Sequence, residues 1–303
     1  MKNQLHEKYN GIIPPVLTPF NEDKTVDFQT LEKFIDWLCQ QKVDILFPMG
    51  GSGEYQTLEM DERKKIIDSV VKAAGGRKQV FAGTGAASLE ETLELSRYAS
   101  EHGADGVGVV MPTDIPGNEE SIFSYYQAVN DAIDCPFMVY DPRGEGPHSA
   151  TPKLMRKMVD TLDKLVAIKY RTVNGEYMGY MAREISDDIS LFSGAETVFL
   201  QDLSVGASGC VGGGANFYPA LIRELQNRFL DGDILGARKV QYKILEATTV
   251  LENVYWPLSG KIVLQELGLP FKLVTRVEGR AYTEEDIRKI RLYYRELLDI
   301  PNA

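Results

Sequence analysis

The sequence has 303 residues, of which 44% are apolar and 25% are charged, and its formal net charge is −11. A chain of this length and composition can bury a large hydrophobic core, either as one barrel-sized domain or as two smaller domains. The acidic balance argues against a nucleic acid or an anionic membrane as the partner, because both bind basic surfaces. A small anionic substrate remains compatible with it, because a few local hydrogen-bond donors can outweigh a distant net charge.

The cysteines and the apolar runs indicate a cytoplasmic protein. Cys39, Cys135 and Cys210 are odd in number and lie far apart without a CxxC motif, which is typical of a reducing compartment rather than of a disulfide scaffold or a zinc site. Residues 1–10 are polar and lack the apolar core of a signal peptide, and no apolar run approaches the roughly 18 residues of a membrane span. The three histidines show no metal-ligand spacing, so we expect no metal and no other cofactor.

Short apolar runs alternate with amphipathic stretches along most of the chain. Asp27 precedes apolar residues at positions 31, 34, 35 and 38, which is the pattern of a capped amphipathic helix, and Ser88 begins a capping box with Glu91. Thr151 and Pro152 have the residue types of a helix cap and first turn. The runs predicted to form buried strands are residues 12–17, 43–48, 79–83, 106–111, 136–140, 165–169, 189–193 and 207–212.

Eight strand-then-helix units predict parallel strand pairing and an α/β fold, the closed (β/α)8 TIM barrel. We expect the barrel to occupy residues 1–230 and to carry the active site. Residues 231–303 are predicted to be helices that pack on the barrel as an appendix. A doubly wound open sheet is the alternative, but the glycine fingerprint that normally follows the first strand of such a sheet is absent.

Lys169 ends one of the predicted buried strands. The preceding residues 165–168 are apolar without a helical period, as in a strand buried on both faces of a parallel sheet. A lysine there must be paired, or its pKa must fall so that the amine is neutral. A neutral amine at the carboxyl end of a barrel strand is a nucleophile for a ketone. The alternative is a lysine that reaches solvent from the end of the strand.

Active sites of such barrels lie at the carboxyl ends of the strands, so the residues that follow the other runs are also candidates. Residues 50–54 read GGSGE, and their amides and the Ser52 hydroxyl can hold a carboxylate, although a tight turn is the simpler explanation. Tyr140 ends a strand and can be catalytic or merely packed. The loop at 50–53 lacks the Gly-Lys-Ser/Thr of an ATP-binding loop, which argues against ATP. The glycines at 212–214 can bind a phosphate instead.

These pieces together resemble the dihydrodipicolinate synthase/N-acetylneuraminate lyase family of Schiff-base barrel enzymes. Residues 50–54 are similar to its G-T/S-T-G-E signature, residues 140–142 to its Tyr-Asn-x-Pro, and residues 168–169 to its lysine-bearing strand. Residues 193–196 and 209–216 correspond to its later loops. The resemblance runs from about Gly11 to the final helices.

The resemblance implies a lyase in which Lys169 forms an imine with the 2-oxo group of pyruvate or a longer 2-keto acid, while Tyr140 transfers protons. It also implies a homo-oligomer, a tetramer or a dimer, which the apolar and aromatic-rich residues 242–256 favour independently. The residues expected to bind the substrate are Gly51, Ser52, Gly194, Val211 and Arg143.

Three departures from the family pattern bear on the reaction. The loop at 111–116 lacks the tyrosine that crosses to a neighbouring subunit in the synthase, Gly51 stands where the family has threonine, and Arg143 is displaced from the position of the arginine that binds the aldehyde substrate. They favour aldol cleavage or dehydration of a 2-keto-3-deoxy acid. The alternatives are dihydrodipicolinate synthase itself and a non-catalytic protein that binds keto acids.

Overall fold

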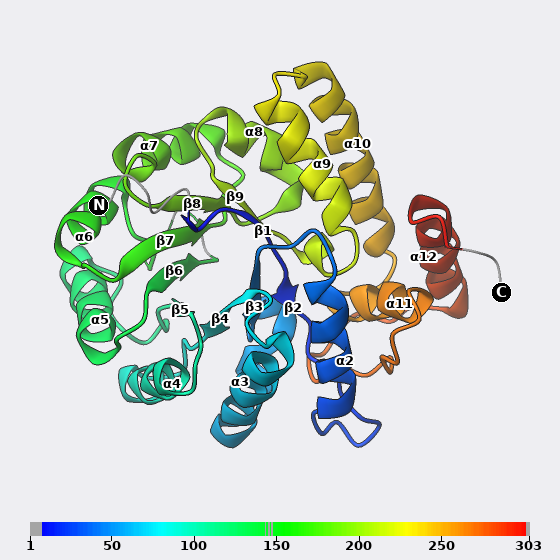
Figure 1. The fold of residues 1–303 in the computed structure, drawn as a ribbon, viewed down its shortest axis with the longest axis horizontal. Helices are drawn as coiled ribbons and strands as arrows, with labels where there is room; N and C mark the ends of the chain where they lie inside the picture. Colours follow the sequence, from blue (N-terminus) through cyan, green and yellow to red (C-terminus); the bar gives the residue numbers. More distant parts are fainter. Residues whose placement is uncertain (1–7, 143, 145, 147, 301–303) are drawn as a thin grey trace.

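The computed structural model describes residues 8–142, 144, 146 and 148–300. In this part of the chain nine parallel strands form one nearly closed barrel, in the order β1-β9-β8-β7-β6-β5-β4-β3-β2, and helices surround it (Figure 1). This confirms the predicted (β/α)8 barrel. The strands are β1 (Gly11–Ile13), β2 (Pro15–Val16), β3 (Ile45–Pro48), β4 (Gln79–Gly83), β5 (Gly106–Val109), β6 (Phe137–Asp141), β7 (Leu165–Tyr170), β8 (Ser190–Ser193) and β9 (Gly209–Val211).

The first predicted strand is divided in two at Pro14. β1 pairs with β9, whereas β2 pairs with β3. This one stretch of chain therefore joins β9 to β3 and closes the ring of strands. A proline has no N–H to donate to a neighbouring strand, and its carbonyl accepts a hydrogen bond of 3.1 Å from the Phe47 amide. The interruption therefore lies at the closure of the barrel.

The helices begin where the sequence places capping residues. Asp27 accepts a hydrogen bond from the Thr30 amide; Ser88 accepts one from the Glu91 amide; and Thr151 accepts one from the Leu154 amide. The helices are α2 (Phe28–Cys39), α3 (Met60–Ala74), α4 (Leu89–Glu101), α5 (Glu119–Ala132), α6 (Pro152–Thr161), α7 (Gly175–Ile185), α8 (Phe199–Ser204), α9 (Pro219–Leu230), α10 (Ile234–Leu251), α11 (Leu258–Glu266) and α12 (Glu284–Leu297). Within the described ranges, no helix is long and apolar enough to span a bilayer.

The hydrophobic core has two layers. A large cluster of buried side chains lies between the strands and the surrounding helices. The interior of the barrel holds a second cluster, which includes Ile13, Ile45, Phe47, Phe81, Met138, Val166, Phe192 and Val211. Because these side chains fill the barrel, a ligand is expected to bind at the end of the barrel and not along its axis.

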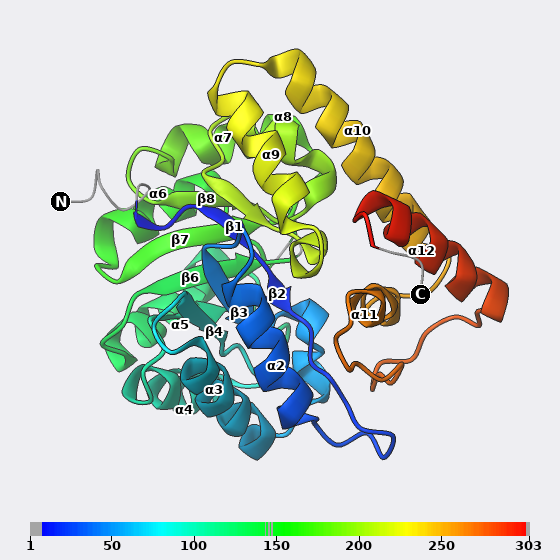
Figure 2. The same ribbon diagram turned by 45° about the vertical axis from the view of Figure 1, so that its right-hand side comes forward.

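The C-terminal helices α10, α11 and α12 lie beside the barrel (Figure 2). The Gln241 side chain of α10 donates hydrogen bonds to the carbonyls of Glu196 (2.9 Å) and Thr197 (3.2 Å) and accepts one from the Leu200 amide (2.9 Å). Buried residues of α11 and α12 belong to the same large cluster as those of the barrel helices. The boundary at residue 230 remains a prediction, but the helices beyond it share the barrel's core.

A buried ion pair joins the loop after β3 to α11. Lys261 Nζ lies 2.8 Å from Glu54 Oε1, and both side chains are inaccessible to solvent. The other Glu54 oxygen accepts hydrogen bonds from the Thr275 hydroxyl and the Arg276 amide. Glu54 therefore connects residues at the mouth of the barrel to two C-terminal segments.

Replacing Lys261 by methionine should leave the Glu54 carboxylate buried without its cation and lower the free energy of unfolding by about 3–5 kcal/mol. Denaturant titration measures this change. The control is Lys64→Met, which breaks the exposed pair between Lys64 and Glu94 and should change stability by less than about 1 kcal/mol. Equal losses in the two variants would contradict a special role for the buried pair.

Candidate active site

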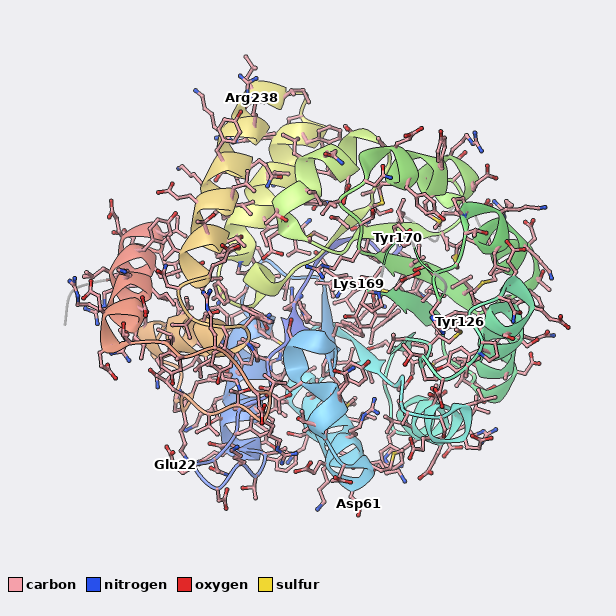
Figure 3. All side chains as sticks on the ribbon, turned by 180° about the vertical axis from the view of Figure 1, so that it is seen from behind. Glu22, Asp61, Tyr126, Lys169, Tyr170 and Arg238 are labelled. Atoms are coloured by element: carbon pink, nitrogen blue, oxygen red, sulfur yellow. The ribbon has the colours of Figure 1, made fainter. Side chains whose placement is uncertain are left out.

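A cavity of about 600 Å³ opens at the carboxyl ends of the strands. Figure 3 shows Lys169 near the middle of the molecule, far from peripheral residues such as Asp61 and Arg238. The predicted site residues that line this cavity are Gly51, Ser52, Tyr140, Lys169, Gly194 and Val211. Arg143, also predicted, lies outside the described residues.

Lys169 is the penultimate residue of β7, one residue before the strand ends, and its side chain is only 5% exposed. Nζ lies 4.2 Å from the centre of the Tyr140 ring, and no carboxylate of the described residues forms an ion pair with it. Burial lowers the pKa of this lysine to about 8; the charge of Arg171 acts in the same direction, and Cys210 and Glu196 oppose it. The amine is therefore neutral far more often at pH 7 than an ordinary lysine.

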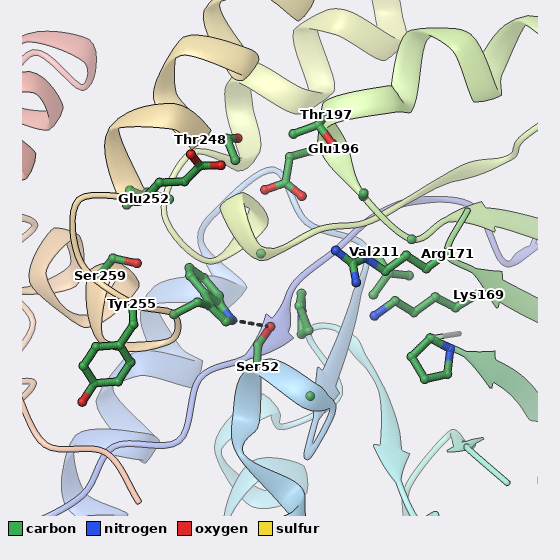
Figure 4. A pocket seen from close by; sticks show the side chains of 18 of the residues that line it. Ser52, Lys169, Arg171, Glu196, Thr197, Val211, Thr248, Glu252, Tyr255 and Ser259 are labelled. Carbon is green, nitrogen blue, oxygen red and sulfur yellow. Dashed lines mark hydrogen bonds between the residues drawn. The ribbon is translucent and has the colours of Figure 1, made fainter. Parts of the chain in front are cut away.

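The predicted loop 50–54 contains a short 3-10 helix, η2 (Gly51–Gly53). The first amides of such a turn have no acceptor within it and can bind an anion. Ser52 Oγ accepts a hydrogen bond of 3.2 Å from Trp256 Nε1 (Figure 4). A Cβ at Gly51 would lie 3.2 Å from the Tyr140 hydroxyl, so glycine allows the loop to approach this phenol.

The carboxyl group of Glu196 also lines the cavity, and it is already engaged in hydrogen bonds. Glu196 Oε1 accepts hydrogen bonds from the Gly214 amide (2.7 Å) and the Tyr218 hydroxyl (3.2 Å). Asp202 is buried outside the lining of the cavity, where its Oδ2 accepts a hydrogen bond of 2.5 Å from Ser193 at the end of β8, and burial raises the pKa of Asp202 to about 6. Neither group supplies a direct counter-ion to Lys169.

Comparison with known proteins identifies the family. The model of the Dihydrodipicolinate synthetase family matches residues 8–289. The chain belongs to this family. It is 33% identical over 265 residues to a 4-hydroxy-tetrahydrodipicolinate synthase of Thermus thermophilus, a match that covers 86% of this chain and 87% of that protein.

Solved structures of the family agree with this assignment. Dihydrodipicolinate synthase from Aquifex aeolicus superposes with a TM-score of 0.88 at 27% identity, covering 97% of this chain and 99% of that one. YagE from Escherichia coli K12, a family member solved in complex with pyruvate, has a TM-score of 0.87 at 25% identity and covers 97% and 99% of the two chains. The likeness extends over essentially the whole chain.

Several residues that line the cavity were not found from the sequence. The position of Arg171 at the cavity could have been predicted, because a residue two positions after Lys169 points to the same face of an extended strand. Most of the others come from the C-terminal region, whose distance in sequence hides its place at the cavity. They include Thr248, Leu251, Tyr255 and Trp256.

The glycines at 212–214 have packing partners in this family member. The Gly214 amide already donates to Glu196, and Cβ atoms at Gly213 and Gly214 would lie 3.0 Å from the Trp256 ring and 2.0 Å from the Tyr218 ring. The Glu196 carboxylate at the Gly214 amide would repel a phosphate. The structure therefore favours close packing over phosphate binding as the reason for these glycines.

The low pKa of Lys169 predicts a pH-dependent effect of replacing it by methionine. Lys169 has a pKa near 10.4 in the unfolded chain and about 8 in the folded protein. Between these two pH values the unfolded chain binds more protons than the folded protein, so the stability of the wild type rises with pH. Lys169→Met has no such gain. At pH 7 the variant does not carry the cost of burying a charge, which favours it relative to wild type. This contribution to the difference in unfolding free energy should shrink by about 3 kcal/mol between pH 7 and 10.5.

Denaturant titrations of both proteins across this range measure the difference. Between pH 5 and 6, where this lysine is protonated in both states, the difference should be constant, which provides the internal control. A difference that stays constant up to pH 10.5 would contradict the lowered pKa.

Proposed function

We propose that the protein is a class I lyase that acts on a 2-keto acid through an imine at Lys169. The observation that carries the proposal is the burial of this amine beside Tyr140, with no ion-pair partner among the described residues. Membership of the family and the likeness to a member bound to pyruvate support it. The net reaction that we favour is aldol cleavage or dehydration of a 2-keto-3-deoxy acid.

In this reaction the neutral Lys169 amine attacks the C2 carbonyl, and loss of water leaves an iminium ion. The iminium accepts the electron pair of the C3–C4 bond in aldol cleavage. In dehydration, it accepts the pair from the C3–H bond before hydroxide leaves C4. Tyr140 carries the protons, and the start of η2 at Gly51 and Ser52 holds the C1 carboxylate. Gly194 and Val211 border the substrate opposite this loop.

Incubation with pyruvate and borohydride should reduce the imine and add a pyruvyl mass to the peptide that contains Lys169. Lys169→Met should abolish the adduct, because a thioether cannot condense with a ketone. The matched control is Lys164→Met, which replaces a lysine near the opposite end of the same strand. An adduct elsewhere, or none with any 2-keto acid, would leave the non-catalytic binding protein as the better account.

The same family supplies the second candidate, 4-hydroxy-tetrahydrodipicolinate synthase, which is the name of the Thermus thermophilus relative described above. A coupled assay with pyruvate and aspartate semialdehyde tests this reaction directly. A panel of 2-keto-3-deoxy sugar acids, with identification of the products, tests cleavage and dehydration. The missing tyrosine at 111–116 and the glycine at 51 favour cleavage or dehydration over the synthase reaction.

We also propose a homo-oligomer, a dimer or a tetramer, in the cytoplasm. Apolar side chains project from one face of α10, where Leu235, Tyr242 and Leu245 are 63%, 60% and 40% exposed, and faces of this kind pack against other chains. The free cysteines suit a reducing compartment.

Light scattering at micromolar concentration should give a mass at least twice that of the chain, which is 33.9 kDa. Tyr242→Glu should shift the mass toward the monomer if α10 forms the contact, whereas Arg183→Glu, at a largely exposed side chain of α7, should not. A wild-type protein that is monomeric at this concentration would refute the oligomer.

A further inference from the structure

Arg171 directly follows β7 and shares a face with Lys169. Its amide donates a hydrogen bond of 3.0 Å to the Asp141 carbonyl, which continues the pairing of β6 with β7 by one residue. Residues two apart in an extended chain point the same way and are about 6.6–6.8 Å apart. Figure 4 shows the ends of Lys169 and Arg171 pointing in the same direction, into the space bounded by Ser52 and Glu196.

Gly194, which directly follows the neighbouring strand β8, packs closely against this arginine. The Gly194 amide donates to the Tyr170 carbonyl over 2.9 Å. A Cβ at Gly194 would lie 2.7 Å from Arg171 Cβ and 2.8 Å from its Cα, so any larger residue would displace Arg171. Backbone on both sides thus holds the start of the side chain, which is the condition for precise recognition of a ligand.

The guanidinium of Arg171 forms no hydrogen bond or ion pair with any described residue. Arginines elsewhere in the protein do find carboxylates, for example Arg276 with Glu62 at 2.6 Å. Glu196, an acidic group of the cavity wall, is engaged by Gly214 and Tyr218. An open guanidinium in a cavity is a ready site for a carboxylate, which it can bind through two parallel hydrogen bonds.

We propose that Arg171 binds an anionic group at the far end of the substrate, so that the preferred substrates are 2-keto acids with a second carboxylate. This inference rests on the proposed imine at Lys169, because that bond places the keto carbon next to Arg171. The C1 carboxylate is assigned to the start of η2, which follows β3 and lies on the other side of the cavity. Arg171 then supplies the distal cation that the sequence suggested at Arg143.

The cation has a second effect on the site. A positive charge two residues from Lys169 disfavours protonation of the amine, in agreement with the direction in which Arg171 moves the pKa of Lys169. Recognition and activation thus use the same side chain.

The test compares borohydride trapping of two keto acids with the same five-carbon chain, 2-oxoglutarate and 2-oxopentanoate. Wild type should reach half-maximal trapping at a concentration of 2-oxoglutarate about 10- to 100-fold lower than that of 2-oxopentanoate, because only the former offers a second carboxylate. Arg171→Gln should bring this ratio close to one. Arg171→Lys keeps the charge and should retain part of the preference, since an ammonium lacks the two-pronged geometry.

The pH profile of trapping with pyruvate supplies an independent readout. Its midpoint should move to higher pH in Arg171→Gln and stay near the wild-type value in Arg171→Lys. Arg183→Gln, at a largely exposed arginine of α7, is the matched control and should behave as wild type in both assays.

Each other outcome overturns a specific statement. Absence of any pyruvate adduct in wild type would defeat the proposed function itself. Normal pyruvate trapping with an unchanged ratio in Arg171→Gln would defeat only the role of Arg171. Arg280 is another arginine that lines the cavity. Loss of the ratio in Arg143→Gln or Arg280→Gln, and not in Arg171→Gln, would assign the distal cation to one of those residues. If Arg171→Gln, at a pH above its midpoint, weakens pyruvate as much as 2-oxoglutarate, the guanidinium binds the C1 carboxylate.

Discussion

The site depends on one constraint: the ammonium of Lys169 must leave water at the end of β7 without gaining a carboxylate among the described residues. Desolvation then favours the neutral amine. The acidic groups near it do not reverse this effect, because Glu196 is held by the Gly214 amide and the Tyr218 hydroxyl, and Asp202 by Ser193. The barrel thus favours the nucleophilic, neutral form of Lys169, because it buries the amine without an ion-pair partner among the described residues.

A second buried lysine shows the opposite solution. Lys261 is as inaccessible as Lys169, but it lies 2.8 Å from Glu54 and also donates to the Val274 carbonyl. Burial lowers the pKa of Lys261 as well, while Glu54 acts to raise it. The difference between a structural lysine and a candidate nucleophile therefore lies in the neighbouring groups and not in burial alone.

The C-terminal helices contribute directly to the cavity. Trp256 donates to Ser52, and Lys261 pairs with Glu54, so two contacts from this region hold the same loop after β3. That loop presents the amides to which we assign the C1 carboxylate. The appendix is thereby part of the support of the proposed site, although its sequence contains no recognisable motif.

Local patterns in the sequence were sufficient for the barrel, for Lys169 at a buried strand end and for the family resemblance, because strand and helix periods and short motifs are properties of neighbouring residues. They did not reveal that the two parts of the first strand pair with different neighbours, that Trp256 forms part of the cavity wall or that Gly194 packs closely on Arg171. Those features depend on residues distant in sequence, such as Ser52 beside Trp256 or Gly194 beside Arg171. Only the closure of the barrel brings such pairs together, because no local pattern specifies a contact between residues so far apart in sequence.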